Sequence, residues 1–194
     1  NMYRNIGWRP PVEMTPELMK PVLDFFINHG VTAIADGFIE GESVLETLAE
    51  MERNGELQIR YDGFVRCDSL SELPEKVEEV KRYDRKYGGR HIRVNTMKVF
   101  MDGTNESGNA FLVEPKVNDP AGRDRGRPVM SEDEFTKYLI FCNDHHIDVH
   151  VHLVGDGAFR LCCNAYEKAK KTSVKKWNIE LTLAHCELVH PDDM

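Results

Sequence analysis

The stretch HIDVHVHLVGDGAF, residues 146–159, indicates both the fold of this chain and the chemistry it serves. It places His150 and His152 two residues apart in an apolar run, and a Gly-Asp-Gly turn follows at once. Side chains two apart in a strand point to the same face of a sheet. Parallel α/β proteins build their sites at the carboxyl ends of strands, so this segment predicts two imidazoles at a functional rim.

Two further apolar segments carry a reactive side chain near their carboxyl ends. His185 lies in IELTLAHCEL, residues 179–188, and Lys98 lies in IRVNTMKVFMDG, residues 92–103. The carboxyl ends of parallel strands meet at one edge of the sheet. One amine and several imidazoles delivered there by successive strands indicate a metal-dependent hydrolase.

Strand and helix patterns alternate along the chain. This βα spacing predicts a parallel sheet, and strands that are apolar on both sides predict that both faces are covered. A GxGxxG motif is absent after the first strand, and the site residues come from several strands, which favours a barrel over an open doubly wound sheet. The predicted strands are residues 31–37, 57–67, 91–103, 147–154 and 179–187.

Local signals mark helix starts and one long loop. Two Ser-x-x-Glu pairs, Ser43 with Glu46 and Ser131 with Glu134, predict capping boxes. Residues 103–130 show neither a helical nor a strand period. A loop of this length in a compact domain is usually functional or mobile, and we expect this one to contribute to substrate specificity.

The composition limits the class of protein. The 194 residues are 41% hydrophobic and carry a net charge of −8, which argues against nucleic acid as the main partner. No apolar run approaches the roughly 20 residues of a membrane helix, and the N-terminal NMYRNIGWRPP lacks the apolar core of a signal peptide. Five cysteines without a CxxC pair indicate reduced thiols and a cytoplasmic location.

His152 and His185 are the predicted metal ligands. Catalytic zinc takes three protein ligands and leaves one position for water, whose pKa falls to roughly 7. Asp156, in the turn after His152, is placed to orient an imidazole. His150 lies one layer deeper in the same phase, where packing in the core is the simpler interpretation.

Lys98 stands between two apolar residues of a strand that the pattern predicts to be buried. Burying an ammonium group is costly, so the amine must find a partner or lose its charge. Two interpretations stay open. Lys98 forms a salt bridge with Asp102, which shares its strand phase, or its neutral amine takes up carbon dioxide and becomes a carbamate that can bridge two metal ions.

Several motifs together resemble the amidohydrolase superfamily, and within it family 3, which includes N-substituted formamide deformylase-like and exoenzyme regulatory proteins. The resemblance covers nearly the whole chain, with one departure at Ala184, a position that is often acidic in the family. The motifs are KVFMDG (98–103), VHVHLVGDGA (149–158), AHCELVHPDD (184–193), GVTAIAD (30–36) and GELQIR (55–60).

The resemblance implies a (β/α)8 barrel that hydrolyses non-peptide C–N bonds through metal-activated water, with one or two divalent ions, zinc foremost. By position, Lys98 corresponds to the ligand of strand four and would be carboxylated. His152 corresponds to the ligand of strand five and His185 to that of strand six. Asp156 and Asp102 would not bind the metal themselves but would help to position these three catalytic ligands.

Two elements of the family have no counterpart in these residues, namely the H-x-H pair of strand one and the aspartate of strand eight. We therefore expect residues 1–194 to form a single partial α/β barrel domain, a fragment with strands two to six and without the flanking β-sandwich. Such a piece is expected to be inactive alone, and its open sheet edges would allow a homo-oligomer. The substrate would be a small amide, with no membrane partner.

Two other functions stay open. A non-catalytic binding or regulatory barrel would have lost its metal site, and metal analysis separates it from an enzyme. A metal-free barrel enzyme would bind a phosphorylated ligand at the loops after strands seven and eight.

Overall fold

The computed structural model describes residues 14–194, and the prediction about the N-terminal segment NMYRNIGWRPP lies outside that range. In the described part, five strands form one sheet: β1 (Ala33–Asp36), β2 (Arg60–Arg66), β3 (Ile92–Phe100), β4 (Asp148–Leu153) and β5 (Leu181–His185). The helices are α2 (Pro16–Asn28), α3 (Glu42–Arg53), α4 (Leu73–Tyr87), α5 (Glu132–His145) and α6 (Asp156–Thr172), followed by the short 3-10 helix η1 (Pro191–Asp193).

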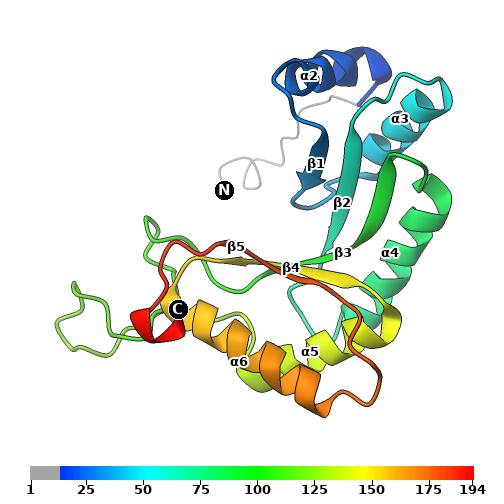
Figure 1. Cartoon of the computed structure of the whole chain (residues 1–194). Helices are drawn as coiled ribbons and strands as arrows, with labels where there is room; N and C mark the ends of the chain where they lie inside the picture. The colour runs from blue at the N-terminus through cyan, green and yellow to red at the C-terminus, as the bar shows by residue number, and fades with distance from the viewer. Residues whose placement is uncertain (1–13) are drawn as a thin grey trace.

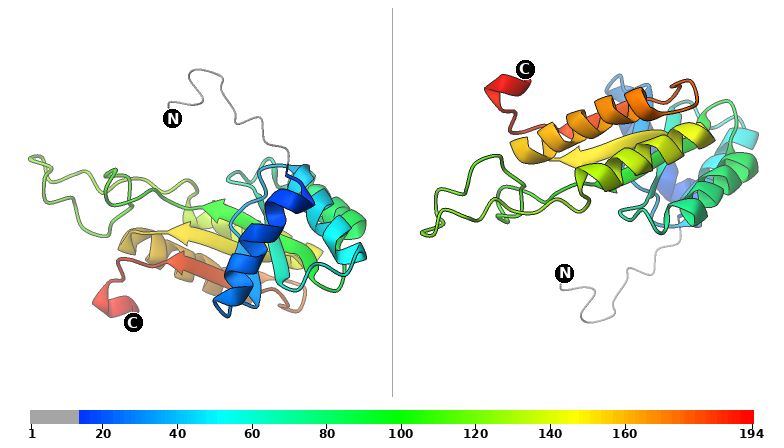
Figure 2. Two further views of the ribbon diagram at one scale, coloured as in Figure 1. Left: turned by 90° about the horizontal axis from the view of Figure 1, so that it is seen from above. Right: turned by 90° about the horizontal axis from the view of Figure 1, so that it is seen from below.

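All neighbouring strands pair in parallel, in the order β1-β2-β3-β4-β5. The sheet curls like part of a barrel wall, with α3, α4, α5 and α6 along its convex side (Figure 1). Figure 2 shows α5 and α6 side by side against β4. Each predicted strand is present, so the parallel α/β architecture is confirmed. Within residues 14–194 no helix is both long enough and apolar enough to span a membrane.

The convex face of the sheet carries the core. Its central strands β3 and β4 present side chains with no solvent exposure to the helices, among them Val99 and Val151. The edge strands β1 and β5 are partly exposed along their length. The helices lie along the convex side, and coverage is fullest over the central strands (Figure 1).

Strand register places the polar residues of the concave face in rows. Lys98 pairs with Arg66 on one side and with His150 on the other. Phe100 pairs with His152 in the next row. Between the pairs Asp62–Arg93 and Phe64–Thr96 the register shifts by one residue in β3, a bulge that the sequence pattern did not predict.

One of the two predicted capping boxes is confirmed. Ser131 accepts a hydrogen bond from the Glu134 amide, and the Glu134 carboxylate accepts one from the Ser131 amide at 2.8 Å. The prediction for Ser43 and Glu46 is wrong, because α3 begins at Glu42 and has no side-chain cap. The Glu46 carboxylate instead accepts a hydrogen bond from the hydroxyl of Tyr87 at 3.1 Å, so a contact with α4 replaces the local one.

The long loop, residues 103–130, contains no helix or strand and is anchored on the turn between β4 and α6. The Asp102 carboxylate accepts hydrogen bonds from the amides of Phe111, Val154 and Gly155, each at 2.9 Å. The Phe111 carbonyl accepts one from the Ala158 amide at 3.2 Å. One buried carboxylate thus joins the end of β3, the loop and the turn.

The glycines of the turn give the loop room to approach. A Cβ atom on Gly155 would lie 2.0 Å from the Phe111 carbonyl oxygen. One on Gly157 would lie 2.8 Å from the carbonyl carbon of Leu112. Neither glycine has a positive φ, so the close approach of the loop backbone, and not an unusual turn conformation, requires glycine at both positions.

Replacing Gly155 with alanine should displace the loop. We expect Gly155→Ala to lower the free energy of unfolding by about 1–3 kcal/mol, because the new methyl group overlaps backbone atoms that cannot move independently. Urea unfolding measures this, and trypsin should cleave faster after Arg123 and Arg125. The control is Gly37→Ala, whose Cβ meets nothing within 4 Å. Equal stability of the two variants would contradict the account.

Candidate functional site

Two of the predicted ligands, His152 and His185, meet at the carboxyl ends of β4 and β5. Their ring centroids are 4.6 Å apart, with an interplanar angle of 67°. His152 is 9% exposed, and burial, followed by the proximity of His185, lowers its pKa. His185 is exposed to solvent. The pair therefore offers a neutral imidazole in the interior and a second imidazole that an incoming ligand can reach.

His185 reaches this position through an unusual backbone conformation. Leu181 and Leu183 pack against the core, and simple strand alternation would direct His185 to their side of the sheet. Its φ is 76°, and the φ of Cys186 is 47°. Residues other than glycine rarely adopt such values, and they do so at a cost, often at functional sites. The left-handed residue ends β5 and brings the imidazole beside His152.

Lys98 lies buried on the concave face with 4% exposure. Its Nζ is 3.0 Å from Nδ1 of His150, and no carboxylate lies within ion-pair distance among residues 14–194. Burial lowers the pKa of the Lys98 amine, with Asp68 acting weakly in the opposite direction. Burial, followed by the proximity of Lys98, lowers the pKa of His150 to about 4. These two nitrogens thus form a mutual contact in which neutral forms are favoured.

The two predicted supporting carboxylates bind backbone amides. Asp102 holds the three amides described above and makes no salt bridge with Lys98. Asp156 accepts a hydrogen bond from the amide of Val113 at 2.9 Å. Both carboxylates therefore act on the loop and the turn that frame the site. Neither forms a hydrogen bond with an imidazole.

Two residues beside His152, namely Phe100 and Arg66, were not among the site residues predicted from the sequence. The Phe100 ring lies 4.9 Å from the His152 ring and 4.5 Å from the guanidinium carbon of Arg66. Arg66 is bound by Asp68 at 2.6 Å. Arg66 ends β2 just as His185 ends β5, so its place at a strand end was the signal that could have identified it.

Whether these side chains can bind a metal ion depends on Lys98. In the described part of the chain no three His, Cys, Asp or Glu side chains cluster so as to hold an ion. Catalytic zinc sites use three protein ligands. His152 and His185 provide two, and Lys98, on the neighbouring strand β3, is the predicted third ligand.

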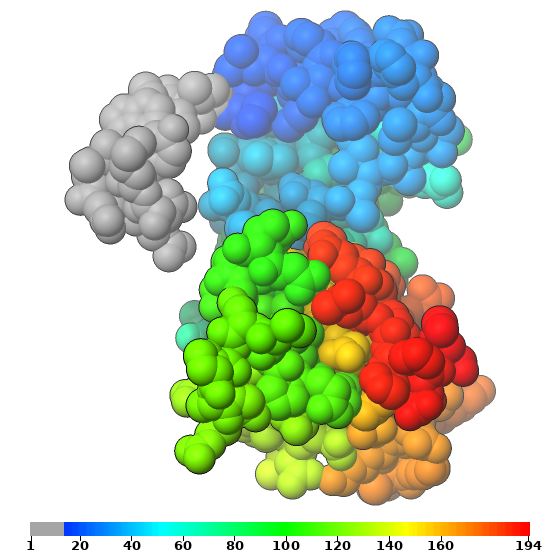
Figure 3. Space-filling view, turned by 90° about the vertical axis from the view of Figure 1, so that its left-hand side faces the viewer, coloured from blue at the N-terminus to red at the C-terminus, as the bar shows by residue number. Residues whose placement is uncertain are grey.

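The loop and the segment after β5 border the site. The Asn105 amide donates a hydrogen bond to the Glu187 carboxylate at 3.2 Å and joins the two segments. In the space-filling view both segments lie around the carboxyl end of β4, with the α2–α3 region on the other side of a hollow (Figure 3).

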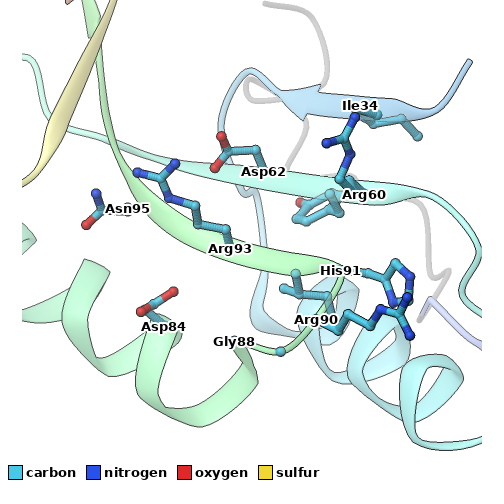
Figure 4. Close-up of a pocket in the computed structure, with 13 residues that line it drawn as sticks. Ile34, Arg60, Asp62, Asp84, Gly88, Arg90, His91, Arg93 and Asn95 are labelled. Carbon is cyan, nitrogen blue, oxygen red and sulfur yellow. The ribbon is translucent and has the colours of Figure 1, made fainter. Parts of the chain in front are cut away.

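A cavity of about 730 Å³ lies at the opposite ends of β1, β2 and β3 (Figure 4). Arg60, Arg93 and Asp62 line it, and Arg93 donates a hydrogen bond to Asp148 at 2.7 Å. One carboxylate oxygen of Asp62 is buried and unpaired within the described residues. None of the predicted site residues lines this cavity. Its volume alone does not make it the site, because the reactive groups converge at the other rim.

The curated relatives are longer proteins. The exoenzymes regulatory protein AepA of Pectobacterium carotovorum subsp. carotovorum is 24% identical over 180 residues, which are 93% of this chain and 37% of that protein. "Putative amidohydrolase YtcJ" of Bacillus subtilis (strain 168) is 31% identical over 157 residues, 76% of this chain and 29% of that protein. The chain thus spans about a third of the length of these relatives.

Solved structures share the fold. The crystal structure of an uncharacterized metal-dependent hydrolase from Pyrococcus furiosus superposes with a TM-score of 0.68 at 25% identity, over 92% of this chain and 36% of that one. A second, from Pyrococcus horikoshii OT3, gives 0.66 at 21%, over 92% and 34%. The partial barrel is confirmed. A model of the amidohydrolase family matches residues 17–194, and the chain accordingly belongs to the amidohydrolase family, as its motifs indicated.

Proposed function

We propose that this chain contributes metal ligands to an amidohydrolase that cleaves a non-peptide, amide-type C–N bond. Lys98, His152 and His185 would hold a divalent ion, with zinc as the first choice. The observation that carries the proposal is the contact between the His152 and His185 rings, 4.6 Å apart at the carboxyl ends of neighbouring strands. The family, and the solved hydrolases described as metal-dependent, support the same conclusion.

The donor set suits such an ion. Metals bind the neutral form of imidazole, and the lowered pKa of His152 favours that form at neutral pH. Among residues 14–194, no carboxylate lies within ion-pair distance of Lys98. A neutral amine is the form that can take up carbon dioxide, and the lowered pKa of Lys98 supports a carbamate at this position as part of the proposal.

A bound divalent ion would supply an activated water and polarise the substrate carbonyl. The residues of this chain supply the surroundings. Phe100 covers one side of His152 and limits its access to water. Asp102 and Asp156 hold the loop against the turn after β4, so that the loop borders the site. We propose that residues 103–130 select the substrate from there.

Zinc binding tests the proposal directly. Titration of the purified 194-residue chain by calorimetry should give about one zinc per chain. His152→Ala and His185→Ala should each weaken binding at least about tenfold, because each removes a ligand. His29→Ala is the matched control, since His29 is exposed and its ring, within the described part of the chain, bonds to the Phe25 carbonyl of its own helix.

The alternative is a non-catalytic regulatory barrel, which the name of the relative AepA supports. That function predicts no stoichiometric zinc. A chain that binds none, or binds it equally well without His152 and His185, would contradict the hydrolase proposal and favour the alternative.

In the metal-free protein, the buried amine of Lys98 should lower the free energy of unfolding. An amine buried without a carboxylate partner is unfavourable, so Lys98→Met is expected to raise the free energy of unfolding by about 1 kcal/mol while it weakens zinc binding. Lys76→Met is the control, because Lys76 pairs with Glu79 at 2.7 Å and should gain nothing. Urea unfolding in a chelator measures both. A loss of stability in Lys98→Met would show that the amine is structural.

The proposal includes a cytoplasmic location. The use of cysteine supports it: Cys67, Cys142 and Cys162 are buried free thiols, a form that persists in a reducing compartment. The substrate would be a small molecule carrying an amide-type bond.

A further inference from the structure

The cavity of about 730 Å³ lies at the amino-terminal ends of β1, β2 and β3, at the rim opposite to His152 and His185. Arg60 and Asp62 stand two apart in β2, so their side chains point to the same face of the sheet. Arg93 pairs with Asp62 in register and shares that face. In Figure 4, Asp62 lies between Arg60 and Arg93. The cavity thus presents one acidic group flanked by two basic ones.

The carboxylate of Asp62 lacks a hydrogen-bond partner. One of its oxygens is buried and accepts no hydrogen bond within residues 14–194. Arg93, which pairs with Asp62 in register, donates instead to the carboxylate of Asp148 at 2.7 Å. A buried carboxylate oxygen without a donor is unfavourable, and native structures contain few such groups. A ligand that brings a positively charged donor would satisfy it.

The charges around Asp62 also favour a cationic group. Burial raises the pKa of Asp62, Arg93 opposes this shift, and Asp148 and Asp84 add to it. Two of these three neighbouring charges are negative, so an added positive charge would be stabilised here. In the part of the chain that the structure describes, no three His, Cys, Asp or Glu side chains cluster so as to hold a metal ion. An organic ammonium group therefore suits this position better than a metal ion.

The other end of the cavity is basic. Arg60 and Arg90 line it on the side of Asp62 away from Arg93 (Figure 4), and neither forms an ion pair among residues 14–194. A guanidinium offers paired donors that match a carboxylate. Residues two apart in a strand are separated by about 6.6 Å. A molecule that carries an ammonium and a carboxylate on one carbon atom can bridge two side chains at that spacing.

The wall of the cavity between α4 and β3 is held in place before any ligand binds. The His91 amide donates a hydrogen bond to the Glu52 carboxylate at 2.6 Å, and the Val94 amide donates one to Asp84 at 3.1 Å. A Cβ atom on Gly88 would lie 2.4 Å from the Asp84 carbonyl oxygen, so the backbone packs closely there. A preformed wall lowers the entropic cost of binding a small ligand.

We infer that this cavity binds a free α-amino acid, whose ammonium group donates to Asp62 and whose carboxylate is bound by Arg60. The residues of β3 from Arg93 to Phe100, which lies beside His152, extend over about 20 Å. An amino acid bound at Asp62 would not reach the proposed metal ligands. It would therefore be an accessory ligand and not the substrate, and the inference does not depend on the hydrolase proposal.

Four probes test the inference. L-alanine and L-leucine carry both charged groups and differ in the size of the side chain. L-alaninamide lacks the carboxylate, and N-acetyl-L-alanine lacks the ammonium group. Each is titrated into the ¹⁵N-labelled 194-residue chain in a chelator, and the backbone amide signals of residues 60–62 and 88–93 are followed by NMR. We expect saturable shifts with at least one of the amino acids, and binding about tenfold weaker or more for L-alaninamide and N-acetyl-L-alanine.

Matched variants complete the experiment. Asp62→Asn and Arg60→Gln should each weaken amino acid binding about tenfold or more, because each removes one charged contact. Asp24→Asn on α2 and Arg85→Gln on α4 change residues that do not line the cavity, and both should bind as the unmodified chain does. Without ligand, Asp62→Asn should melt no lower than the unmodified chain, because this carboxylate has no partner to lose. Circular dichroism measures the melting and shows that each variant is folded.

The absence of saturable shifts with both amino acids would overturn the inference. Equal binding of L-alanine and L-alaninamide, or unchanged binding by Asp62→Asn, would do the same. A lower melting temperature of Asp62→Asn would show that the carboxylate is structural and would also contradict it. Because the titration is performed without metal, its outcome is independent of the zinc experiment.

Discussion

The buried carboxylate of Asp102 is the interaction on which the rim of the site depends. Its two oxygens satisfy the amides of Phe111, Val154 and Gly155, which belong to the loop and to the turn after β4. Leaving such buried amides without an acceptor costs about 1–3 kcal/mol for each group. Asp102 lies two residues after the end of β3. Its side chain therefore connects the strand of Lys98 with the strand of His152 and fixes the position of the first part of the loop.

Nitrogen groups gather around Phe100 on the concave face. One imidazole, one amine and one guanidinium lie near Phe100, and Asp68 is the carboxylate that contacts the guanidinium. A sheet selected only for stability would pair or remove the buried amine of Lys98, and it would avoid the left-handed backbone at His185. Both features are costs that the proposed metal site would explain.

The sequence predicted the parts of the structure that follow from period and spacing. The five strands, the parallel order and the strand ends carrying Lys98, His152 and His185 all follow from the alternation of apolar segments. The bulge in β3 and the positive φ of His185 could not be predicted, because neither leaves a mark in the pattern. The role of Asp156 and the contact between Lys98 and His150 depend on which distant backbone or strand lies alongside, and only the tertiary structure shows that.

X-ray absorption at the zinc edge tests the central claim most directly, because it reports which atoms hold the ion. For the zinc-loaded chain our account predicts two imidazole nitrogens at about 2.0–2.1 Å, with oxygen or nitrogen in the remaining positions and no sulfur. The imidazole signal should fall by half in either single-histidine variant. A sulfur shell at about 2.3 Å, from the free cysteines, or a spectrum without imidazole scattering would contradict the placement of the site.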